Sequence, residues 1–323
     1  MRRLMMRLIA CGAIGAFSAL VPAAAQEWPA RPVRIIIPLG PGGGGDVFTR
    51  ALAEELQKSL GQPFVVENRP GADSAIAAEQ VSKMSADGYT LMFASNSAMT
   101  AAVALRKNPT YDPLKDFTPI SMVGRATVFF YVHPEVPAKT LKEFIAHARA
   151  NPGKLVYGTG NPLSILYGQQ LMSATGMQML HVPYKGEGPL NPDILAGRVH
   201  SSFLSTGSAV SNAKDGRLRP LAVLLERRSP LLPEVPTITE AGVPEVTVRQ
   251  WAGIFGPPNL PKDIVARLNK EVNAALQRPD VIAKLQSYGY SPEGSTPERL
   301  VEVNRADLEL WRKLVKEAGI PLE

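Results

Sequence analysis

The stretch VRIIIPLGPGGGGDVFTRALAEEL, residues 33–56, decides the fold. It opens with an apolar run at 33–39, passes through five glycines in six positions, and continues as a segment with helical spacing. An apolar run without alternation is typical of a strand buried on both faces of a parallel sheet. The apolar residues that follow predict a helix over 46–61, with Asp46 as its N-cap and Gly61 as its C-cap.

The glycines between that strand and that helix fit two kinds of site. Gly40, Gly42 and Gly45 have the spacing G-x-G-x-x-G, and Glu67 follows about twenty residues later, as in a dinucleotide-binding fingerprint. However, Pro41 interrupts the tight turn, and Glu67 is followed by the turn sequence NRPG. Glycine amides at a helix N-terminus attract any anion, so a carboxylate suits them as well as a phosphate. We therefore predict a site for a small organic anion, without a nucleotide or other cofactor.

The N-terminus predicts export. Arg2, Arg3 and Arg7 precede an apolar stretch that ends in three alanines, and this pattern predicts a signal peptide over 1–25, cleaved after Ala25. An uncleaved membrane anchor is the alternative, although the apolar part is short for a membrane span. Cleavage would also remove Cys11, the only cysteine, which leaves neither disulfides nor thiol chemistry.

Charge and histidine spacing argue against nucleic-acid binding and against a zinc site. Removal of three arginines and no acids lowers the formal net charge from +6 to +3. The remaining cations form no basic run with interleaved aromatic residues, so nucleic acid is not an expected partner. The four histidines show neither H-x-x-x-H nor H-E-x-x-H spacing, which argues against a zinc site.

The rest of the chain alternates short β-branched runs with amphipathic segments, which predicts an α/β protein with parallel strands. The run at 126–134 reads as a strand leaving a first lobe, and the run at 250–258 as a strand returning to it, followed by two helices at 261–277 and 297–319. We predict lobe 1 over 26–124 and 252–323, and lobe 2 over 125–251. A ligand is expected in the cleft between them, at the carboxyl ends of the strands.

Three further loops place small polar residues at predicted strand ends. They are ASNSAMT at 94–100, YGTGNPLS at 157–164 and FLSTGS at 203–208. Each alone is explained equally well as a helix cap or a turn. Together with the glycine loop they favour a polar cleft. Lys185 is the only cation at these loops, so backbone amides and hydroxyls are expected to hold the anion.

An enzyme is the rival hypothesis. Ser164 or His181 could serve a periplasmic hydrolase, although no G-x-S-x-G motif is present. A strand-end histidine bonded to backbone is the simpler interpretation of His181. A sensor that reports its ligand to a membrane kinase is a third hypothesis.

Several motifs occur in an order that resembles one family. They include GQPFVVENRPGA at 61–72, YDPLKDFTPIS at 111–121, HVPYKGEGP at 181–189 and WAGIFGPPNLPKDIVARLN at 251–269. The chain resembles the substrate-binding proteins of tripartite tricarboxylate transporters, also called Bug-type receptors. The resemblance implies a two-lobed, type II periplasmic binding-protein fold that closes on a small carboxylate in the interdomain cleft. It also implies delivery to a membrane permease, no catalytic step, and a monomer.

The resemblance also implies which residues bind the ligand. These are the first glycine loop, the strand–glycine–helix loop of lobe 2, and small polar groups nearby: Leu39, Gly42, Gly43, Gly44, Gly45, Asp46, Ser95, Asn96, Ser97, Gly158, Thr159, Gly160, Asn161, Tyr184, Lys185 and Ser205. The chain departs from the family pattern at Leu39, Asp73, Leu166 and Leu204. Leucines at positions 39 and 166 predict a more apolar pocket, and hence a longer-chain or aromatic carboxylate rather than citrate.

Overall fold

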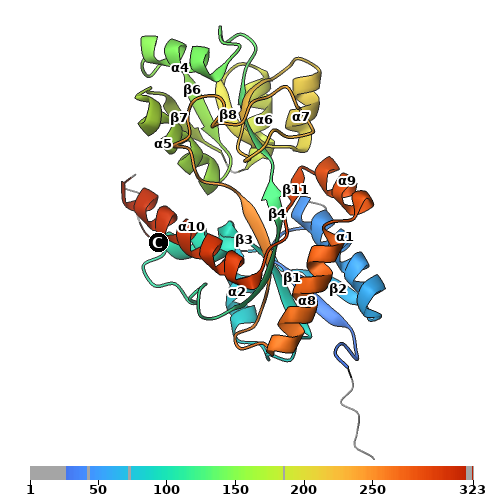
Figure 1. Ribbon diagram of the computed structural model, residues 1–323. Coiled ribbons are helices and arrows are strands. Elements are labelled where there is room, and N and C mark those ends of the chain that lie inside the picture. Colours follow the sequence, from blue (N-terminus) through green and yellow to red (C-terminus); the bar gives the residue numbers. More distant parts are fainter. Residues whose placement is uncertain (1–26, 42–43, 72–73, 185, 318–321, 323) are drawn as a thin grey trace, which may run out of the picture.

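The computed structural model describes residues 27–41, 44–71, 74–184, 186–317 and 322, and the predicted signal peptide lies outside these ranges. Two sheets lie in separate lobes, with α-helices around each (Figure 1). The first sheet has the strand order β11-β4-β10-β3-β1-β2 and the second β7-β6-β8-β5-β9. The α/β class is therefore confirmed.

The first lobe takes its elements from both ends of the chain. Its strands are β1 (Val33–Ile37), β2 (Phe64–Asn68), β3 (Thr90–Ser95), β4 (Thr118–Ala126), β10 (Trp251–Gly256) and β11 (Tyr290–Pro292). Its helices are α1 (Gly44–Leu60), α2 (Ala75–Ser82), the π-helical turn η2 (Ser97–Ala101), α3 (Ala102–Ala104), α8 (Lys262–Ala275), α9 (Pro279–Ser287) and α10 (Pro297–Glu317).

The second lobe is built from the middle of the chain. Its strands are β5 (Val128–Val132), β6 (Val156–Thr159), β7 (Leu180–Pro183), β8 (Ser201–Ser205) and β9 (Arg219–Val223). Its helices are α4 (Leu141–Ala150), α5 (Pro162–Thr175), α6 (Glu187–Leu195) and α7 (Gly207–Lys214). The chain passes between the sheets twice, from β4 to β5 and from β9 to β10 (Figure 1).

Both sheets are mixed, which corrects the expectation of parallel strands. β1 pairs in parallel with β2 and β3, and β6 with β7 and β8, as the alternating pattern predicts. β10 runs antiparallel to β3 and β4, and β5 runs antiparallel to β8 and β9. β5 and β10 each follow a passage between the lobes, where the chain enters a sheet from the opposite end, and β11 also pairs antiparallel, with β4.

The two predicted caps of α1 have different outcomes. Gly61 has φ 72° and its amide donates to the Gln57 carbonyl at 3.0 Å, so the C-cap is confirmed. The Asp46 N-cap is wrong, because α1 begins at Gly44 and Asp46 lies in its first turn. Gly44 and Gly45 therefore belong to the helix itself. Their amides are among those that a helix N-terminus leaves without intrahelical partners.

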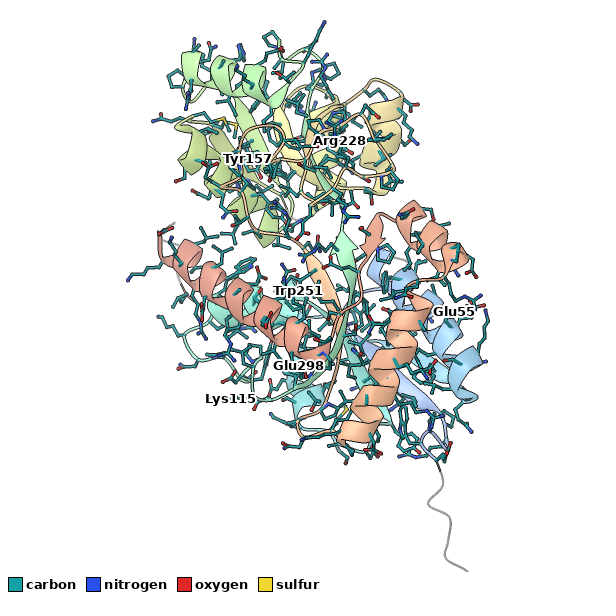
Figure 2. All side chains as sticks on the ribbon, in the orientation of Figure 1. Glu55, Lys115, Tyr157, Arg228, Trp251 and Glu298 are labelled. Carbon is teal, nitrogen blue, oxygen red and sulfur yellow. The ribbon has the colours of Figure 1, made fainter. Side chains whose placement is uncertain are left out.

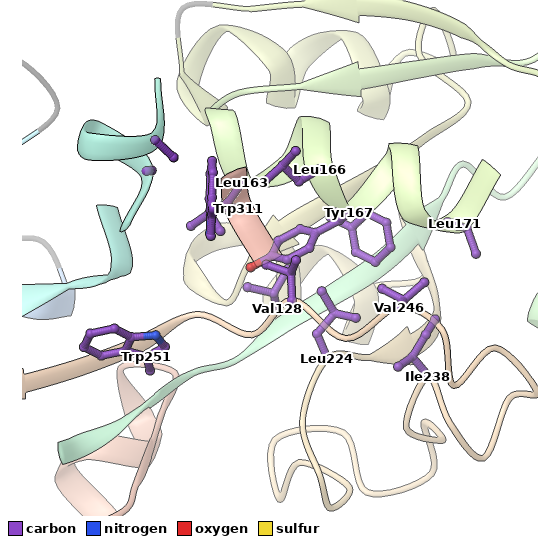
Figure 3. Packing of buried hydrophobic residues seen from close by; sticks show 14 of the residues in the cluster. Val128, Leu163, Leu166, Tyr167, Leu171, Leu224, Ile238, Val246, Trp251 and Trp311 are labelled. Carbon is purple, nitrogen blue, oxygen red and sulfur yellow. The ribbon is translucent and has the colours of Figure 1, made fainter. Parts of the chain in front are cut away.

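One apolar cluster extends across both lobes and joins them. It includes Met92 and Trp311 from the first lobe and Phe130, Leu163 and Tyr167 from the second. Figure 3 shows Trp311 on the side of α10 that faces Leu163 of α5. Among the described residues, no helix has both the length and the apolar character needed to cross a membrane.

Candidate functional site

The glycine loop between β1 and α1 is closely packed on its inner side. A Cβ atom on Gly45 would lie 2.6 Å from Leu39 Cδ1 and 3.4 Å from both Phe93 Cε1 and Tyr290 Oη. Leu39 therefore folds over Gly45, and a Cβ atom at this position would require the end of the Leu39 side chain to move. Gly42 and Gly43 lie outside the described residues.

Asn68 holds the two ends of this loop together. Its Nδ2 donates to the Leu39 carbonyl at 3.0 Å and to Asp46 Oδ1 at 2.9 Å. The Asp46 carboxylate is buried and also accepts from Arg50 Nε at 3.1 Å. Asp46 thus fixes the shape of the loop, and Asn68 is a positioning residue that the sequence did not identify. Its place at the carboxyl end of β2, beside β1, was the available signal.

A turn from the far end of the chain lies beside the same loop. The Tyr288 carbonyl oxygen would be 3.3 Å from a Cβ on Gly44, and it accepts from Thr206 Oγ1 of the second lobe at 3.5 Å. The Gly289 carbonyl accepts from the Thr127 amide at 2.7 Å. The turn at 288–290 therefore contacts the glycine loop, a passage between the lobes and the start of α7. Sequence reasoning missed it.

The small polar loop after β3 forms a buried network. Asn96 is fully buried, and its Nδ2 donates to the Arg249 carbonyl at 3.0 Å. The Ser97 amide donates to Ser95 Oγ at 3.3 Å, and η2 follows directly. Thr100 Oγ1 donates to the Asn96 carbonyl at 2.6 Å. Single π-helical turns of this kind often occur at functional sites.

Asp307 of α10 is a buried acid in contact with this network. Its Oδ2 accepts from Trp251 Nε1 at 3.0 Å and from Thr100 Oγ1 at 3.2 Å. Burial raises the pKa of Asp307 to about 6, although hydrogen bonds from Trp251, Asn96 and Thr100 and the charge of Arg125 oppose the shift. Desolvation thus affects the pKa of Asp307 more strongly than the hydrogen bonds do.

This raised pKa predicts that the Asp307 carboxyl destabilises the fold as the pH rises. The Asp307 carboxyl binds its proton more tightly in the folded chain than in the unfolded chain. Its contribution to the free energy of unfolding is therefore fully favourable below about pH 4 and is lost as the pH rises through 6. In Asp307→Asn the side chain stays neutral. We expect the free energy of unfolding of this variant, relative to wild type, to increase by about 3 kcal/mol between pH 4 and pH 7. Urea unfolding at both pH values measures it, and a difference independent of pH would contradict the prediction.

The second glycine loop, after β6, packs directly on the start of α6. A Cβ on Gly160 would lie 2.7 Å from the Glu187 backbone nitrogen and 2.7 Å from the Gly186 carbonyl carbon. The Tyr184 amide donates to the Thr159 carbonyl at 2.7 Å. The main chains after β6 and β7 are therefore locked together at the carboxyl ends of neighbouring strands. Lys185, between them, lies outside the described residues.

The α5 N-terminus in this loop is capped from within. Asn161 Oδ1 accepts from the Ser164 amide at 2.9 Å, and the Asn161 amide donates back to Ser164 Oγ at 3.3 Å. Gly158 is fitted against Leu190 and Val199, where a Cβ would lie 2.4 Å and 2.9 Å from their side chains. This loop is rigid on its inner side and exposes Asn161.

Glu187 connects this loop to the end of β8. Its carboxylate accepts from the Ser205 amide at 3.1 Å and from Ser205 Oγ at 2.7 Å. Tyr184 Oη donates to Asp193 at 2.6 Å, which raises the pKa of the Tyr184 hydroxyl. Ser205 and the Tyr184 side chain thus have internal partners, and Glu187 is a further residue that sequence reasoning missed.

The two residues of the enzyme hypothesis do not form a nucleophile–base pair. Ser164 Oγ donates to the Asn161 carbonyl at 2.7 Å as part of the helix cap. His181 Nε2 lies 2.7 Å from Thr159 Oγ1, so its partner is a side chain and not the expected backbone group. Desolvation lowers the pKa of His181. In the part of the chain that the structure describes, no cluster of His, Cys, Asp and Glu could hold a metal.

The predicted residues that the structure describes form two clusters, one in each lobe. Leu39, Gly44, Gly45 and Asp46 come together in lobe 1, beside the turn at 288–290. Thr159, Gly160, Asn161, Tyr184 and Ser205 come together in lobe 2. Across the described residues, no hydrogen bond joins the loop at 39–46 to the loop at 158–161.

Of the departures from the family pattern, Leu166 and Leu204 are 1% and 0% exposed and belong to the core, whereas Leu39 is partly exposed.

A depression lies at the opposite ends of β1 and β3. It measures about 640 Å³, and Arg31, Arg34, Lys83 and Tyr89 are among the residues that line it. Arg31 pairs with Asp87 at 3.0 Å and stacks over the Tyr89 ring at 3.8 Å. Because its cations already have partners, this depression is a weaker candidate than the loops.

Comparison with known proteins decides between the remaining functions. The family model "Tripartite tricarboxylate transporter family receptor" matches residues 48–320. The chain belongs to this receptor family. Protein BugT of Bordetella pertussis is 35% identical, with 99% of each chain covered.

Two solved structures share the fold. An R. palustris protein solved with adipate is 33% identical, with a TM-score of 0.77 over 92% of this chain and 100% of that one. The periplasmic binding protein BugD is 30% identical, with a TM-score of 0.74 over the same shares. The fold is that of type II periplasmic binding proteins, and the chain is a periplasmic solute-binding receptor. The receptors of this family serve transport and are not enzymes.

Proposed function

We propose that this receptor captures a small carboxylate between its two glycine loops. Both loops connect the carboxyl end of a parallel strand to a helix N-terminus, at α1 in one lobe and α5 in the other. Both contain a glycine that is packed too closely for a Cβ atom. Backbone amides in such loops bind anions without a side-chain charge. This pairing of loops carries the proposal, and the relative solved with adipate supports it.

We propose that the lobes, over 26–124 with 252–323 and over 125–251, close on the ligand by a hinge. The passages at 126–128 and 249–251 are short, and hydrogen bonds to neighbouring segments hold both. Ligand contacts with both lobes would favour the closed state over the open one. The family implies membrane permease subunits as the partners that receive the ligand.

Leu39 bears on which carboxylate binds. It covers Gly45 and remains partly exposed at the glycine loop, so an apolar group borders the proposed anion site. Leu166 was expected to add to this effect, but it is buried in the core and supplies no pocket surface. Leu39 alone therefore supports the hypothesis of a longer-chain or aromatic carboxylate rather than citrate.

A binding screen tests this function. Thermal shift against aliphatic, aromatic and tricarboxylic acids is expected to single out a longer-chain or aromatic acid. At 100 times its Kd, a ligand stabilises the fold by about 2.7 kcal/mol, which raises Tm by several degrees. Isothermal titration then gives the affinity. Tight binding of citrate, together with no binding of apolar carboxylates, would refute the proposed ligand class.

A further inference from the structure

We infer that the turn at 288–290 of lobe 1 sets the position of lobe 2, and with it the separation of the two glycine loops. Gly289 in this turn and Thr206, between β8 and α7 of lobe 2, are the positioning residues. The inference rests on the proposed function for its effect on binding, because a carboxylate held between two loops needs them at a fixed separation.

The main chains of the two lobes approach each other closely at Gly289 and Thr206. A Cβ on Gly289 would overlap the Thr206 hydroxyl oxygen, and it would lie 2.5 Å from Thr206 Cβ and 2.8 Å from Thr206 Cγ2. Rotation of the Thr206 side chain moves its hydroxyl and methyl groups, but it leaves its Cβ in place. The absence of a side chain at Gly289 therefore decides how closely lobe 2 approaches the turn.

The other side of the turn lies against the first glycine loop. A Cβ on Gly44 would lie 3.0 Å from Tyr290 Cε2 and 3.3 Å from the Tyr288 carbonyl oxygen. The Tyr290 ring also packs on Phe48 of α1, with the ring centroids 5.2 Å apart. The turn is thus packed on the loop and the helix that would hold the anion in lobe 1.

In lobe 2, contacts connect Thr206 to the second glycine loop. Thr206 follows Ser205, whose amide and hydroxyl donate to the Glu187 carboxylate at 3.1 Å and 2.7 Å. The Glu187 backbone nitrogen lies 2.7 Å from the position of a Cβ on Gly160. The contact between Thr206 and Gly289 therefore completes a series of contacts that joins the two glycine loops.

The turn is also attached to the passage from β4 to β5. The Gly289 carbonyl accepts from the Thr127 amide at 2.7 Å, and Tyr290 pairs with Ala126 where β11 meets β4 (Figure 1). Thr127, Tyr290 and Leu231 of lobe 2 are among the residues around a gap of only about 10 Å³. The turn thus lies where the chain passes between the lobes, so a small displacement there becomes a larger one at the far ends of the lobes.

The Thr206 side chain can be removed with little effect on α7. Thr206 is the N-cap residue of this helix, but its side chain accepts no capping hydrogen bond from the described residues. Its hydroxyl donates to the Tyr288 carbonyl instead, at 3.5 Å. Glycine is well tolerated at N-cap positions. Thr206→Gly therefore removes the three atoms nearest to a Cβ on Gly289 without removing a cap.

Double electron–electron resonance between spin labels on the two lobes tests the inference without any ligand. Lys115→Cys in lobe 1 and Glu135→Cys in lobe 2 accept the labels, at side chains that are 82% and 87% exposed. The native Cys11 lies in the predicted signal peptide, which the exported protein is expected to lack. Gly289→Ala is expected to shift the distance distribution, because the main chains at the contact must separate by about 1 Å to reach normal carbon–carbon contact.

Two changes at Thr206 grade the effect. Thr206→Gly in the Gly289→Ala chain should restore the wild-type distribution, whereas Thr206→Ala, which keeps Cβ, should restore it only in part. Gly242→Ala is the control, because Gly242 also has a positive φ, 90° against 80° for Gly289, and a Cβ there would have no atom within 4 Å. An unchanged distribution in Gly289→Ala overturns the inference. A shift that Thr206→Gly does not reverse overturns it as well, since strain within the turn would then be the cause.

Isothermal titration with hexanoate and benzoate, an aliphatic and an aromatic carboxylate, tests the effect on binding. Gly289→Ala is expected to bind the acid that wild type prefers about 10-fold or more weakly, because fewer molecules have both loops in the binding arrangement. Thr206→Gly in the same chain should return the affinity to within about threefold of wild type. A shifted distance with an unchanged affinity would overturn the link to the glycine loops. If wild type binds no carboxylate in the wider screen, the proposed function fails, and the distance measurement still decides whether this contact positions the lobes.

Discussion

Replacing Gly160 by alanine is expected to reduce carboxylate affinity by about 100-fold or more, because the new methyl group would meet backbone atoms. The Cβ would lie 2.7 Å from both the Glu187 nitrogen and the Gly186 carbonyl carbon. Main-chain atoms cannot rotate away as a side chain can, so the loop itself must move. That movement shifts the amides at the start of α5, on which the proposed binding of the carboxylate depends. Isothermal titration with the acid that binds wild type best measures the loss.

Two other glycines provide comparisons, Gly188 in the same segment and Gly45 in the loop of lobe 1. A Cβ on Gly188 would have no atom within 4 Å, so Gly188→Ala tests alanine substitution in the same segment without the clash and should bind like wild type. Gly45→Ala would press on the end of the Leu39 side chain at 2.6 Å, which can rotate, so its loss should be intermediate. If Gly160→Ala bound as tightly as Gly188→Ala, the second loop would not be part of the site.

The fold was predictable where the pattern is local. The helices predicted over 261–277 and 297–319 correspond to α8 and α10, because apolar residues recur along both segments at helical spacing. β4 was missed, since its segment TPISMVGRA begins with a polar residue and a proline, which is unusual for a central strand. β11 spans only three residues, and α9 precedes it in a stretch that was not assigned. Pairing direction depends on where the chain re-enters a sheet, which no local pattern records.

The residues of the candidate site were likewise predictable only where the sequence pattern is local. Both glycine loops could be found from sequence, because a strand, a glycine run and a helix start are adjacent in the chain. Asn68 had only an indirect signal in its place at the end of β2, and Glu187 had none, since their roles depend on partners that the fold brings close. The Arg249 carbonyl meets Asn96, which is 153 residues away.

Trp311 is the side chain whose truncation should cost most stability. It is 1% exposed and lies on the buried face of α10 with Leu300, Leu308 and Val315. Its cluster extends into the second lobe through Leu163 (Figure 3). Trp251 of the first sheet, labelled in Figure 2, donates from Nε1 to Asp307 of α10 at 3.0 Å.

Trp311→Ala is expected to lower the free energy of unfolding by about 3–5 kcal/mol, since a buried indole would leave a cavity that the helix and sheet cannot close. Trp311→Phe keeps an aromatic ring and removes an Nε1 that has no hydrogen-bond partner among the described residues, so it should cost less than the alanine change, about 1.5 kcal/mol. Arg312→Ala, at the adjacent exposed position, should stay within about 0.5 kcal/mol of wild type. Urea unfolding followed by circular dichroism measures all three. If Trp311→Ala lowered the free energy of unfolding by less than Trp311→Phe, Trp311 would not anchor α10. Removing the whole ring system of an anchoring residue should cost more stability than removing part of it.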